Sequence, residues 1–238
     1  MREVCLKSQR IKKILSGITD AVYNPENLEK IVKSYIEKKD NLITEYSSVD
    51  DRYFKKAFKE YPIKEYSFPR AAKFTGTMST NKDHGDPFFF DLVNKKVLRL
   101  QNTLGAPQNA LCVLYPDDGY IGWHHNGNAP GYNILFSYSQ DGDGYFKYYD
   151  REKDEVIYMQ DNPGWNVKCG YYPYEKTEPN RVYWHAAATK KARMSIAFVI
   201  PNRDIWINVI EYITDGDYDE DYLKSQGAFH ELKKEGYV

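Results

Sequence analysis

The sequence has few cysteines, no long apolar run and almost no net charge. Its three cysteines, Cys5, Cys112 and Cys169, are far apart and form no C-x-x-C motif, so we expect reduced thiols in a cytoplasmic protein rather than a disulfide scaffold. Neither an apolar signal core nor a membrane span of about 18 apolar residues occurs, so neither secretion nor spanning is indicated. A net charge of −1 provides no global field for nucleic acid or an acidic membrane, although it leaves room for a local basic groove.

Aromatic residues, in contrast, are abundant at 16%, with 22 tyrosines among them. Because Tyr and Phe favour strands, this composition favours an extensive sheet. Residues 1–65 differ, since apolar side chains recur at helical spacing over residues 7–18, 24–46 and 50–62. An irregular or extended segment from 66 to 87 follows. Residues 88–105 then have the pattern of an amphipathic helix that ends at Gly105.

From residue 109 onward, short runs of β-branched and aromatic residues alternate with turn residues. We expect strands at residues 110–116, 120–126, 132–139, 144–150, 155–159, 165–173, 181–187 and 193–200. Eight strands at about ten-residue spacing predict a closed sandwich or jelly roll. The fold class is therefore expected to be mainly β with flanking helices.

One domain accounts for the whole sequence most simply, since neither internal repeats nor a low-complexity linker divide it. Within it we expect an N-terminal helical region (1–65), a lead-in loop and helix (66–108), the β core (109–201) and a C-terminal extension (202–238). The end of that extension is acidic and then weakly helical.

Two of the five histidines stand where a metal site would need them. His124 ends the second predicted strand and His185 lies in the seventh, so a jelly roll could bring them together across the mouth of a barrel. Two histidines from different strands and one carboxylate form the facial triad of non-haem Fe(II) oxygenases, which leaves positions free for a co-substrate and dioxygen. His84 and His230 are expected to be structural or solvated.

The stretch WHAAATKKARMSIAF places Arg193 eight residues after His185, across a short turn. Because side chains alternate along a strand, Arg193 and Ser195 share one face, and we expect that face to point into the barrel near His185. A buried guanidinium requires an anion, and its planar fork matches a carboxylate. The alternative is an ion pair between Arg193 and an acidic side chain at the edge of the strand.

The pattern of these residues resembles that of the Fe(II)/2-oxoglutarate-dependent oxygenases. It consists of a tyrosine, a first histidine, a second histidine and then R-x-S on the following strand. The resemblance covers about residues 88–200 and includes NALCVLYPDDGYIGWH and RVYWHAAATKKARMSIAFV. Within that family, the sequence resembles most the AlkB-like and prolyl-hydroxylase-like branches, including small phage-encoded members. The resemblance implies a double-stranded β-helix, an Fe(II) cofactor and 2-oxoglutarate as co-substrate.

By position, the resemblance implies that His124 and His185 ligate the iron. It implies that Arg193, assisted by Ser195, holds the distal carboxylate of 2-oxoglutarate. Tyr115 would hydrogen-bond the co-substrate, although it could instead be one more tyrosine packed in a core. The implied reaction is a hydroxylation by dioxygen with release of succinate and CO2, which is enzyme class EC 1.14.11.

The pattern departs from the family at Asn126, where the third metal ligand should be Asp or Glu. An amide oxygen can coordinate iron but is neutral, so we expect the affinity for iron to fall. Three interpretations stay open. Asn126 ligates through its oxygen, another carboxylate or a solvent anion replaces it, or the site is inactive and the domain is retained for binding. The loop residues that could donate a carboxylate are Asp83, Asp86, Asp117, Asp118, Asp141 and Asp143.

His125 points opposite to His124 in a regular strand. We expect it to lie behind the ligands or to face the substrate, and we give Trp123 and Asn133 the same expectation.

The prime substrate is expected to be a small molecule or a peptide, with protein or amino-acid hydroxylation slightly ahead of nucleic acid. The stretches NKK at 94–96 and TKK at 189–191, Arg99 and the tyrosine-rich strands keep nucleic acid open, but the net charge does not favour it. A protein of a different class is the alternative: an inactive jelly-roll module that binds a partner. The sequence does not determine the oligomeric state.

Overall fold

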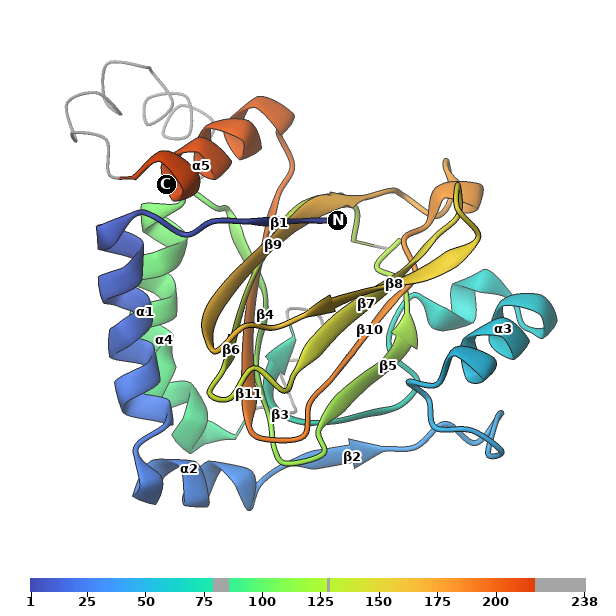
Figure 1. Cartoon of the computed structure of the whole chain (residues 1–238), viewed down its shortest axis with the longest axis horizontal. Coiled ribbons are helices and arrows are strands. Elements are labelled where there is room, and N and C mark those ends of the chain that lie inside the picture. The colour runs from blue at the N-terminus through green and yellow to red at the C-terminus, as the bar shows by residue number, and fades with distance from the viewer. Residues whose placement is uncertain (79–85, 128, 217–238) are drawn as a thin grey trace.

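The structure is a computed structural model that describes residues 1–78, 86–127 and 129–216. Figure 1 shows helices packed against a rolled antiparallel sheet. In chain order the helices are α1 (Gln9–Val22), α2 (Pro25–Val32), α3 (Asp51–Glu60), α4 (Pro87–Thr103) and α5 (Arg203–Asp215). Short 3-10 turns occur at Ile63–Tyr66 and Pro179–Arg181.

Polar side chains determine where these helices begin. In each of the five, the residue before the first helical position accepts a hydrogen bond from a backbone N–H of the first turn. These N-caps are Ser8, Asn24, Asp50, Asp86 and Asn202. All of these residue types are preferred N-caps, so the helix starts follow from the local sequence.

The β core consists of eight strands in two antiparallel halves. They are β4 (Gln108–Tyr115), β5 (Tyr120–His124), β6 (Gly131–Ser139), β7 (Tyr145–Asp150), β8 (Glu155–Gln160), β9 (Gly164–Tyr172), β10 (His185–Ala188) and β11 (Arg193–Ile200). One half has the order β9-β6-β11-β4 and the other β5-β10-β7-β8. The chain passes back and forth between the halves, as in a double-stranded β-helix, so the predicted jelly-roll fold is confirmed.

Three further strands extend this core. β3 (Ala72–Met78) pairs with both β4 and β5 and so connects the two halves, while β1 (Arg2–Val4) lengthens the first half at β9. β2 (Ile36–Lys38) pairs with β3. The expectation of one helix over residues 24–46 was therefore wrong. The helix ends at Val32, and residues 36–38 join the sheet because pairing with β3 outweighs their helical spacing.

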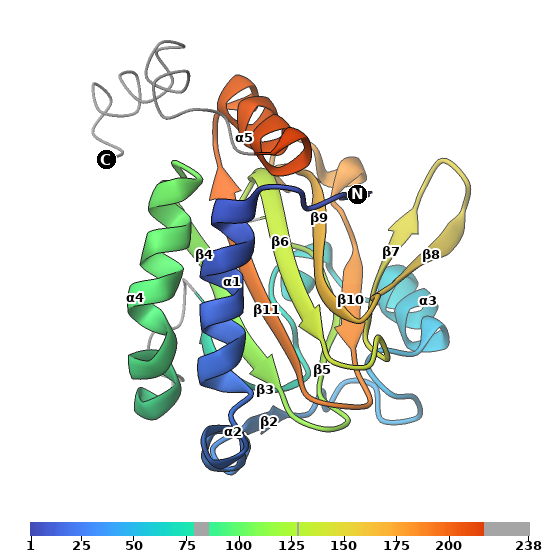
Figure 2. The same ribbon diagram turned by 60° about the vertical axis from the view of Figure 1, so that its left-hand side comes forward.

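The helices α1 and α4 lie side by side on the outer face of the β9-β6-β11-β4 half (Figure 2). Their apolar residues share one hydrophobic core with Met194, Ile196 and Phe198 of β11. Because side chains alternate along a strand, the intervening residues Arg193 and Ser195 face the interior of the barrel. The packing of the helices therefore decides which face of β11 points toward the site.

Two other segments differ from what the sequence suggests. The predicted strand at 181–187 forms only from His185, after a 3-10 turn, and α5 forms at the start of the C-terminal extension, where the expectations from the sequence include no helix. The acidic and then weakly helical tail, expected over residues 215–237, lies outside the described residues from 217 onward, as do Asp83, His84 and His230. No helix in the described ranges is both long and apolar enough to cross a membrane. All three cysteines are free thiols.

Candidate functional site

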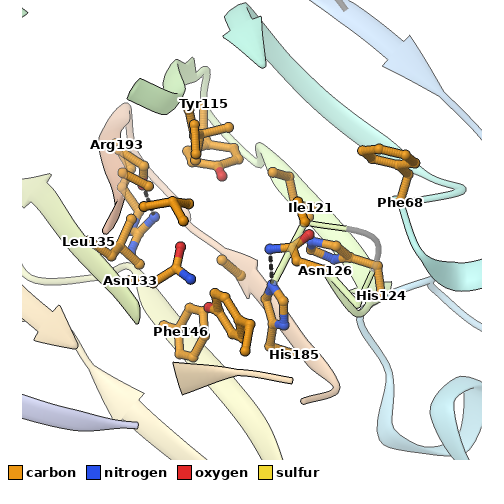
Figure 3. A pocket seen from close by; sticks show the side chains of 18 residues that line it. Phe68, Tyr115, Ile121, His124, Asn126, Asn133, Leu135, Phe146, His185 and Arg193 are labelled. Atoms are coloured by element: carbon orange, nitrogen blue, oxygen red, sulfur yellow. Dashed lines mark hydrogen bonds between the residues drawn. The ribbon is translucent and has the colours of Figure 1, made fainter. Parts of the chain in front are cut away.

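His124 and His185 meet at the mouth of the barrel because their strands are neighbours. They are paired directly across β5 and β10, and their ring centroids lie 4.2 Å apart (Figure 3). The register then shifts, since Ala187 pairs with Ile121, which leaves one extra residue on β5. Such a bulge re-aims side chains. Here it allows both Ile121 and His124 to line one cavity, although they are three positions apart.

Both imidazoles keep an unprotonated Nε2. The Nδ1 of His124 lies 2.8 Å from the Gly122 carbonyl oxygen, and the Nδ1 of His185 lies 2.8 Å from the Tyr183 carbonyl oxygen. A carbonyl only accepts, so Nδ1 carries the proton and Nε2 keeps its lone pair. This backbone anchoring is typical of metal-ligating histidines.

Burial also keeps both histidines neutral. It lowers the pKa of His185 to about 4, and burial together with the nearby His185 lowers the pKa of His124 well below its ordinary value. Phe146 and Tyr172 stack on His185, with ring centroids at 5.4 and 5.1 Å, and hold its plane. Two fixed, neutral imidazoles with free lone pairs are suited to a divalent metal.

Asn126 occupies the third position beside the two histidines. Its Nδ2 lies 3.5 Å from the Nε2 of His185, and turning the amide over would put Oδ1 in the same place (Figure 3). No cluster of three or more His, Cys, Asp or Glu side chains that could hold a metal occurs among the described residues. The described loop carboxylates do not line the cavity, since Asp86 caps α4, Asp117 and Asp118 pair with lysines, and Asp143 accepts from Thr189.

A cavity of about 100 Å³ runs inward from these three side chains to Arg193, Ser195 and Tyr115. Its walls are mostly apolar and include Ile121, Leu135, Phe146 and Ala197. The sequence-predicted residues at positions 115, 124, 126, 133, 185, 193 and 195 all line it. The structure thus brings together residues that are up to 80 positions apart in the sequence (Figure 3).

Arg193 lies at the inner end of the cavity with 1% of its surface exposed. Its Nε lies 2.5 Å from Asp161 Oδ2, and its Nη1 donates to Ser195 Oγ at 2.7 Å. Its Nη2 has no hydrogen-bond partner among the described residues. An acidic partner of Arg193 is therefore present, yet it leaves one nitrogen of the buried guanidinium unpaired.

The charges around Arg193 do not balance. Lys168 is buried as well, and its Nζ lies 2.5 Å from Asp161 Oδ1. Burial alone would raise the pKa of Asp161, but the charge and hydrogen bond of Arg193, with Lys168, lower it to about 2. Burial, the largest effect, and the nearby Arg193 lower the pKa of Lys168, whereas Asp161 raises it. With Lys168 protonated, two cations and one anion leave one positive charge uncompensated. Since a buried unpaired charge is costly, this end of the cavity is suited to a single carboxylate.

Sequence reasoning missed both Asp161 and Lys168. Asp161 stands in the turn QDNPG, where an acidic residue has an ordinary turn role. Lys168 stands in the middle of WNVKCGYY, and a lysine inside an apolar strand was the one available signal. Neither residue indicates by itself that it lies next to Arg193.

Tyr115 lies beside Arg193, whose guanidinium carbon is 5.6 Å from the tyrosine ring centroid. Burial raises the pKa of Tyr115 to about 12, so its hydroxyl keeps its proton and can donate.

His125 and Trp123 do not line the cavity. His125 is fully buried, with Nε2 at 2.8 Å from the Ile63 carbonyl oxygen and Nδ1 accepting from the Gly127 N–H at 3.2 Å. Trp123 stacks on Phe54 of α3. Both residues lie behind the site and fix the segments around it.

No family model matches this chain, and no curated protein is similar to it in sequence. Solved structures do match. One is a Pseudomonas putida prolyl-4-hydroxylase, at 9% identity and a TM-score of 0.31, covering 79% of this chain and 100% of that chain. Another is an oxidoreductase of the 2OG-Fe(II) oxygenase family from Burkholderia pseudomallei, at 10% identity and a TM-score of 0.33, covering 84% of this chain and 95% of that chain.

A third match is Peruvianin-I, a cysteine peptidase from Thevetia peruviana latex, at 13% identity and a TM-score of 0.26. The match covers 38% of this chain and 49% of the peptidase, so this chain spans about half of the peptidase's length. Likeness at these identities and TM-scores does not bear on activity, so the function must be inferred from the residues of this chain.

Proposed function

We propose that this protein is an Fe(II)- and 2-oxoglutarate-dependent oxygenase. One observation carries the proposal: two imidazole Nε2 atoms and an unpaired guanidinium nitrogen share a single cavity inside a double-stranded β-helix. The histidines are suited to a metal and the guanidinium to a carboxylate. Which branch of this superfamily the chain resembles most stays a prediction.

Of the three protein ligands that such an iron site has, two are present here as histidines and the third is an asparagine instead of a carboxylate. His124 and His185 would hold it through Nε2, and Asn126 would contribute an amide oxygen in place of a carboxylate. All three groups are neutral, so the metal would keep its full charge until an anionic ligand arrives. Iron bound there would supply the oxidising power for the hydroxylation.

The co-substrate would be bound by the inner end of the cavity. The distal carboxylate of 2-oxoglutarate would accept from Arg193 Nη2 and from the Ser195 hydroxyl, whose oxygen already accepts from Nη1. It would also neutralise the excess positive charge of the Arg193, Lys168 and Asp161 cluster. The apolar walls would exclude water from the reacting atoms.

A substrate group that reaches the metal meets a largely apolar entrance. Phe68 lies on the His124 and Asn126 side of the cavity (Figure 3), and Arg193 is the one charged side chain among the residues that line the cavity. The proposed substrate is therefore an uncharged part of a small molecule or a peptide, with nucleic acid less favoured. We further propose one domain in the cytoplasm, supported by the core that the helices share with the sheet and by the three free thiols.

A second candidate function is an inactive module that binds a partner or a carboxylate ligand without turnover. The neutral Asn126 favours it, because the described residues offer no carboxylate in its place.

One experiment separates the two functions. The protein is mixed anaerobically with Fe(II) and 2-oxoglutarate, and the charge-transfer absorption of the chelated complex is measured before air is admitted and succinate is assayed. Absorption followed by succinate release supports the oxygenase. A bound complex that never yields succinate supports the inactive module, and failure to bind 2-oxoglutarate contradicts both.

A further inference from the structure

Asn126, the residue that departs from the ligand pattern, is followed by Gly127. This is the one Asn-Gly step in the entire sequence, which has 15 asparagines. Asparagine is a chemically labile residue, and its side-chain amide carbon can be attacked by the backbone nitrogen of the next residue. Glycine in that next position offers the least steric resistance, because it has no Cβ.

We propose that Asn126 is a self-modification site, at which the amide is converted to a carboxylate by the adjacent backbone nitrogen of Gly127. The product would be an aspartate at the third ligand position. The conversion itself does not depend on the proposed function, whereas its consequence for iron rests on it.

The reaction balances without an oxidant or a reductant. The Gly127 nitrogen forms a bond to Asn126 Cγ and loses its proton, while the Cγ–Nδ2 bond breaks and ammonia leaves with a proton. Water then adds to the resulting cyclic imide at Cγ, which restores the Gly127 N–H and leaves a side-chain carboxylate. One water is consumed and one ammonia is released.

The structure provides a proton acceptor at the attacking atom. The Gly127 N–H points at Nδ1 of His125, at an N···N distance of 3.2 Å. The other ring nitrogen lies 2.8 Å from the Ile63 carbonyl oxygen, so it carries the ring proton and leaves the Nδ1 lone pair free. A nucleophile and a base within hydrogen-bond reach form the arrangement that activates a nucleophile. His125 would thus act as the proton acceptor for the Gly127 nitrogen, whereas it has no role in the proposed metal site.

The Asn126 amide is weakly held and only partly buried. Its one hydrogen-bond contact among the described residues is the 3.5 Å approach to His185, at the outer limit for a hydrogen bond. The residue is half-buried, so part of its surface stays exposed to solvent while the rest lines the cavity. Asn133 provides a contrast in the same cavity, because it lies within β6, donates to the Gly131 carbonyl oxygen at 3.1 Å and precedes Ile134.

The fold also favours aspartate over isoaspartate as the product. The Asn126 carbonyl oxygen accepts from Ala129 N at 2.9 Å, and the Gly127 carbonyl oxygen accepts from Glu175 N at 2.8 Å. Isoaspartate would insert an extra atom into the backbone between these two anchored carbonyls. The backbone at Gly127 also packs closely against Glu175, since a Cβ on Gly127 would lie 2.7 Å from Glu175 Cβ. Opening of the imide at Cγ preserves the anchored backbone.

The test compares the native full chain with the same chain unfolded in urea, incubated at the same pH and temperature. Peptide mapping by mass spectrometry follows position 126, with fragmentation that distinguishes aspartate from isoaspartate, and heavy-oxygen water marks the new carboxylate. We expect the native chain to convert at least as fast as the unfolded chain, to aspartate, while Asn133 stays intact. Survival of Asn126 in the native chain alone, or isoaspartate as its main product, would overturn the proposal.

A variant tests the role of His125. His125→Gln retains a donor for the Ile63 carbonyl but removes the basic nitrogen, so we expect native conversion to slow by at least about tenfold. Circular dichroism checks its fold, and an unchanged rate in folded protein would exclude His125 as the proton acceptor.

The metal is tested separately, by titrating fresh and fully converted protein with Mn(II). We expect tighter binding after conversion. Conversion without any gain in Mn(II) affinity would contradict the proposed metal site, while leaving the modification itself supported.

Discussion

The side chains of His124, Asn126 and His185 bring three neutral donors to one point. With no negative charge among them, attraction to a divalent cation depends on lone pairs alone. A carboxylate in place of the amide would add a charge at a few ångströms from the metal, where Coulomb attraction is large even at an effective dielectric constant of about 20. If a metal binds here as proposed, the identity of residue 126 would therefore set the strength of its site.

Asn126→Asp is accordingly expected to raise the affinity of freshly purified protein for Mn(II) or Fe(II) by at least about tenfold. Isothermal titration measures the change. Asn133→Asp is the matched control, since it makes the same chemical change in the same cavity away from the histidine pair. Equal affinity in wild type and Asn126→Asp would mean that Asn126 is not a ligand.

The stability of the folded protein is expected to depend on the charge of Asp161, because this carboxylate pairs with both Arg193 and Lys168. Its pKa in the folded chain is about 2, below the value of about 3.9 in an unfolded chain. A lowered carboxyl pKa stabilises the fold above the unfolded pKa, and this stability is lost as the pH falls through the folded pKa.

We therefore expect Asp161 to contribute roughly 2–3 kcal/mol above pH ~4 that disappears between pH ~4 and ~2. Urea unfolding over this pH range measures it. In Asp161→Asn the loss over the same window should be smaller, although the variant starts from lower stability because two buried cations remain. An identical slope in both proteins would contradict this charge pairing.

At the scale of the element, the loop before β7 passes very close to the Arg193 guanidinium. A Cβ on Gly144 would lie 2.6 Å from Arg193 Cδ and 2.8 Å from Asp161 Oδ2. These contacts are shorter than atoms tolerate, so the loop needs glycine there to let Arg193 and Asp161 pair. The loop that begins β7 thus shapes the Arg193 end of the cavity, while β5 and β10 hold the histidine end.

Gly144→Ala should consequently weaken 2-oxoglutarate binding by about tenfold or more, through displacement of the guanidinium, and leave Mn(II) binding nearly unchanged. Fluorescence or calorimetric titration of each ligand shows the difference. Gly17→Ala on α1 is the control, because its nearest atoms are 3.8 Å away and a helical alanine is well tolerated. Parallel losses for both ligands would indicate a general disturbance of the barrel.

At the scale of the whole molecule, ligands that bind inside the barrel link its two halves. The histidines lie on the β5-β10-β7-β8 half, and Arg193 with Ser195 lies on the other. A ligand that contacts both ends of the cavity therefore stabilises the folded protein as a unit, since the unfolded chain does not hold these groups together.

Mn(II) and 2-oxoglutarate, each at about one hundred times its dissociation constant, should each stabilise the protein by about 2.7 kcal/mol, which corresponds to a rise in Tm of roughly 5–10 °C per ligand for a chain of this size. Differential scanning fluorimetry measures the shift. Arg193→Ala should abolish the part due to 2-oxoglutarate and retain the part due to Mn(II). A full shift in that variant would exclude Arg193 as the carboxylate ligand.

The sequence alone determined that Arg193 and Ser195 share one face of β11, that His124 and His185 belong to different strands, and that an asparagine stands at position 126. These features depend on local spacing and on the order of strands along the chain, both of which can be read from the sequence.

The tertiary structure alone decided that Asp161 and Lys168 flank Arg193, that a bulge in β5 aims His124 inward, and that residues 36–38 form a strand. The physical reason is that a strand's period of two specifies which side chains face inward but not which distant side chains they meet. Those partners depend on which strands become neighbours and in what register. That choice is made by the packing of the whole chain.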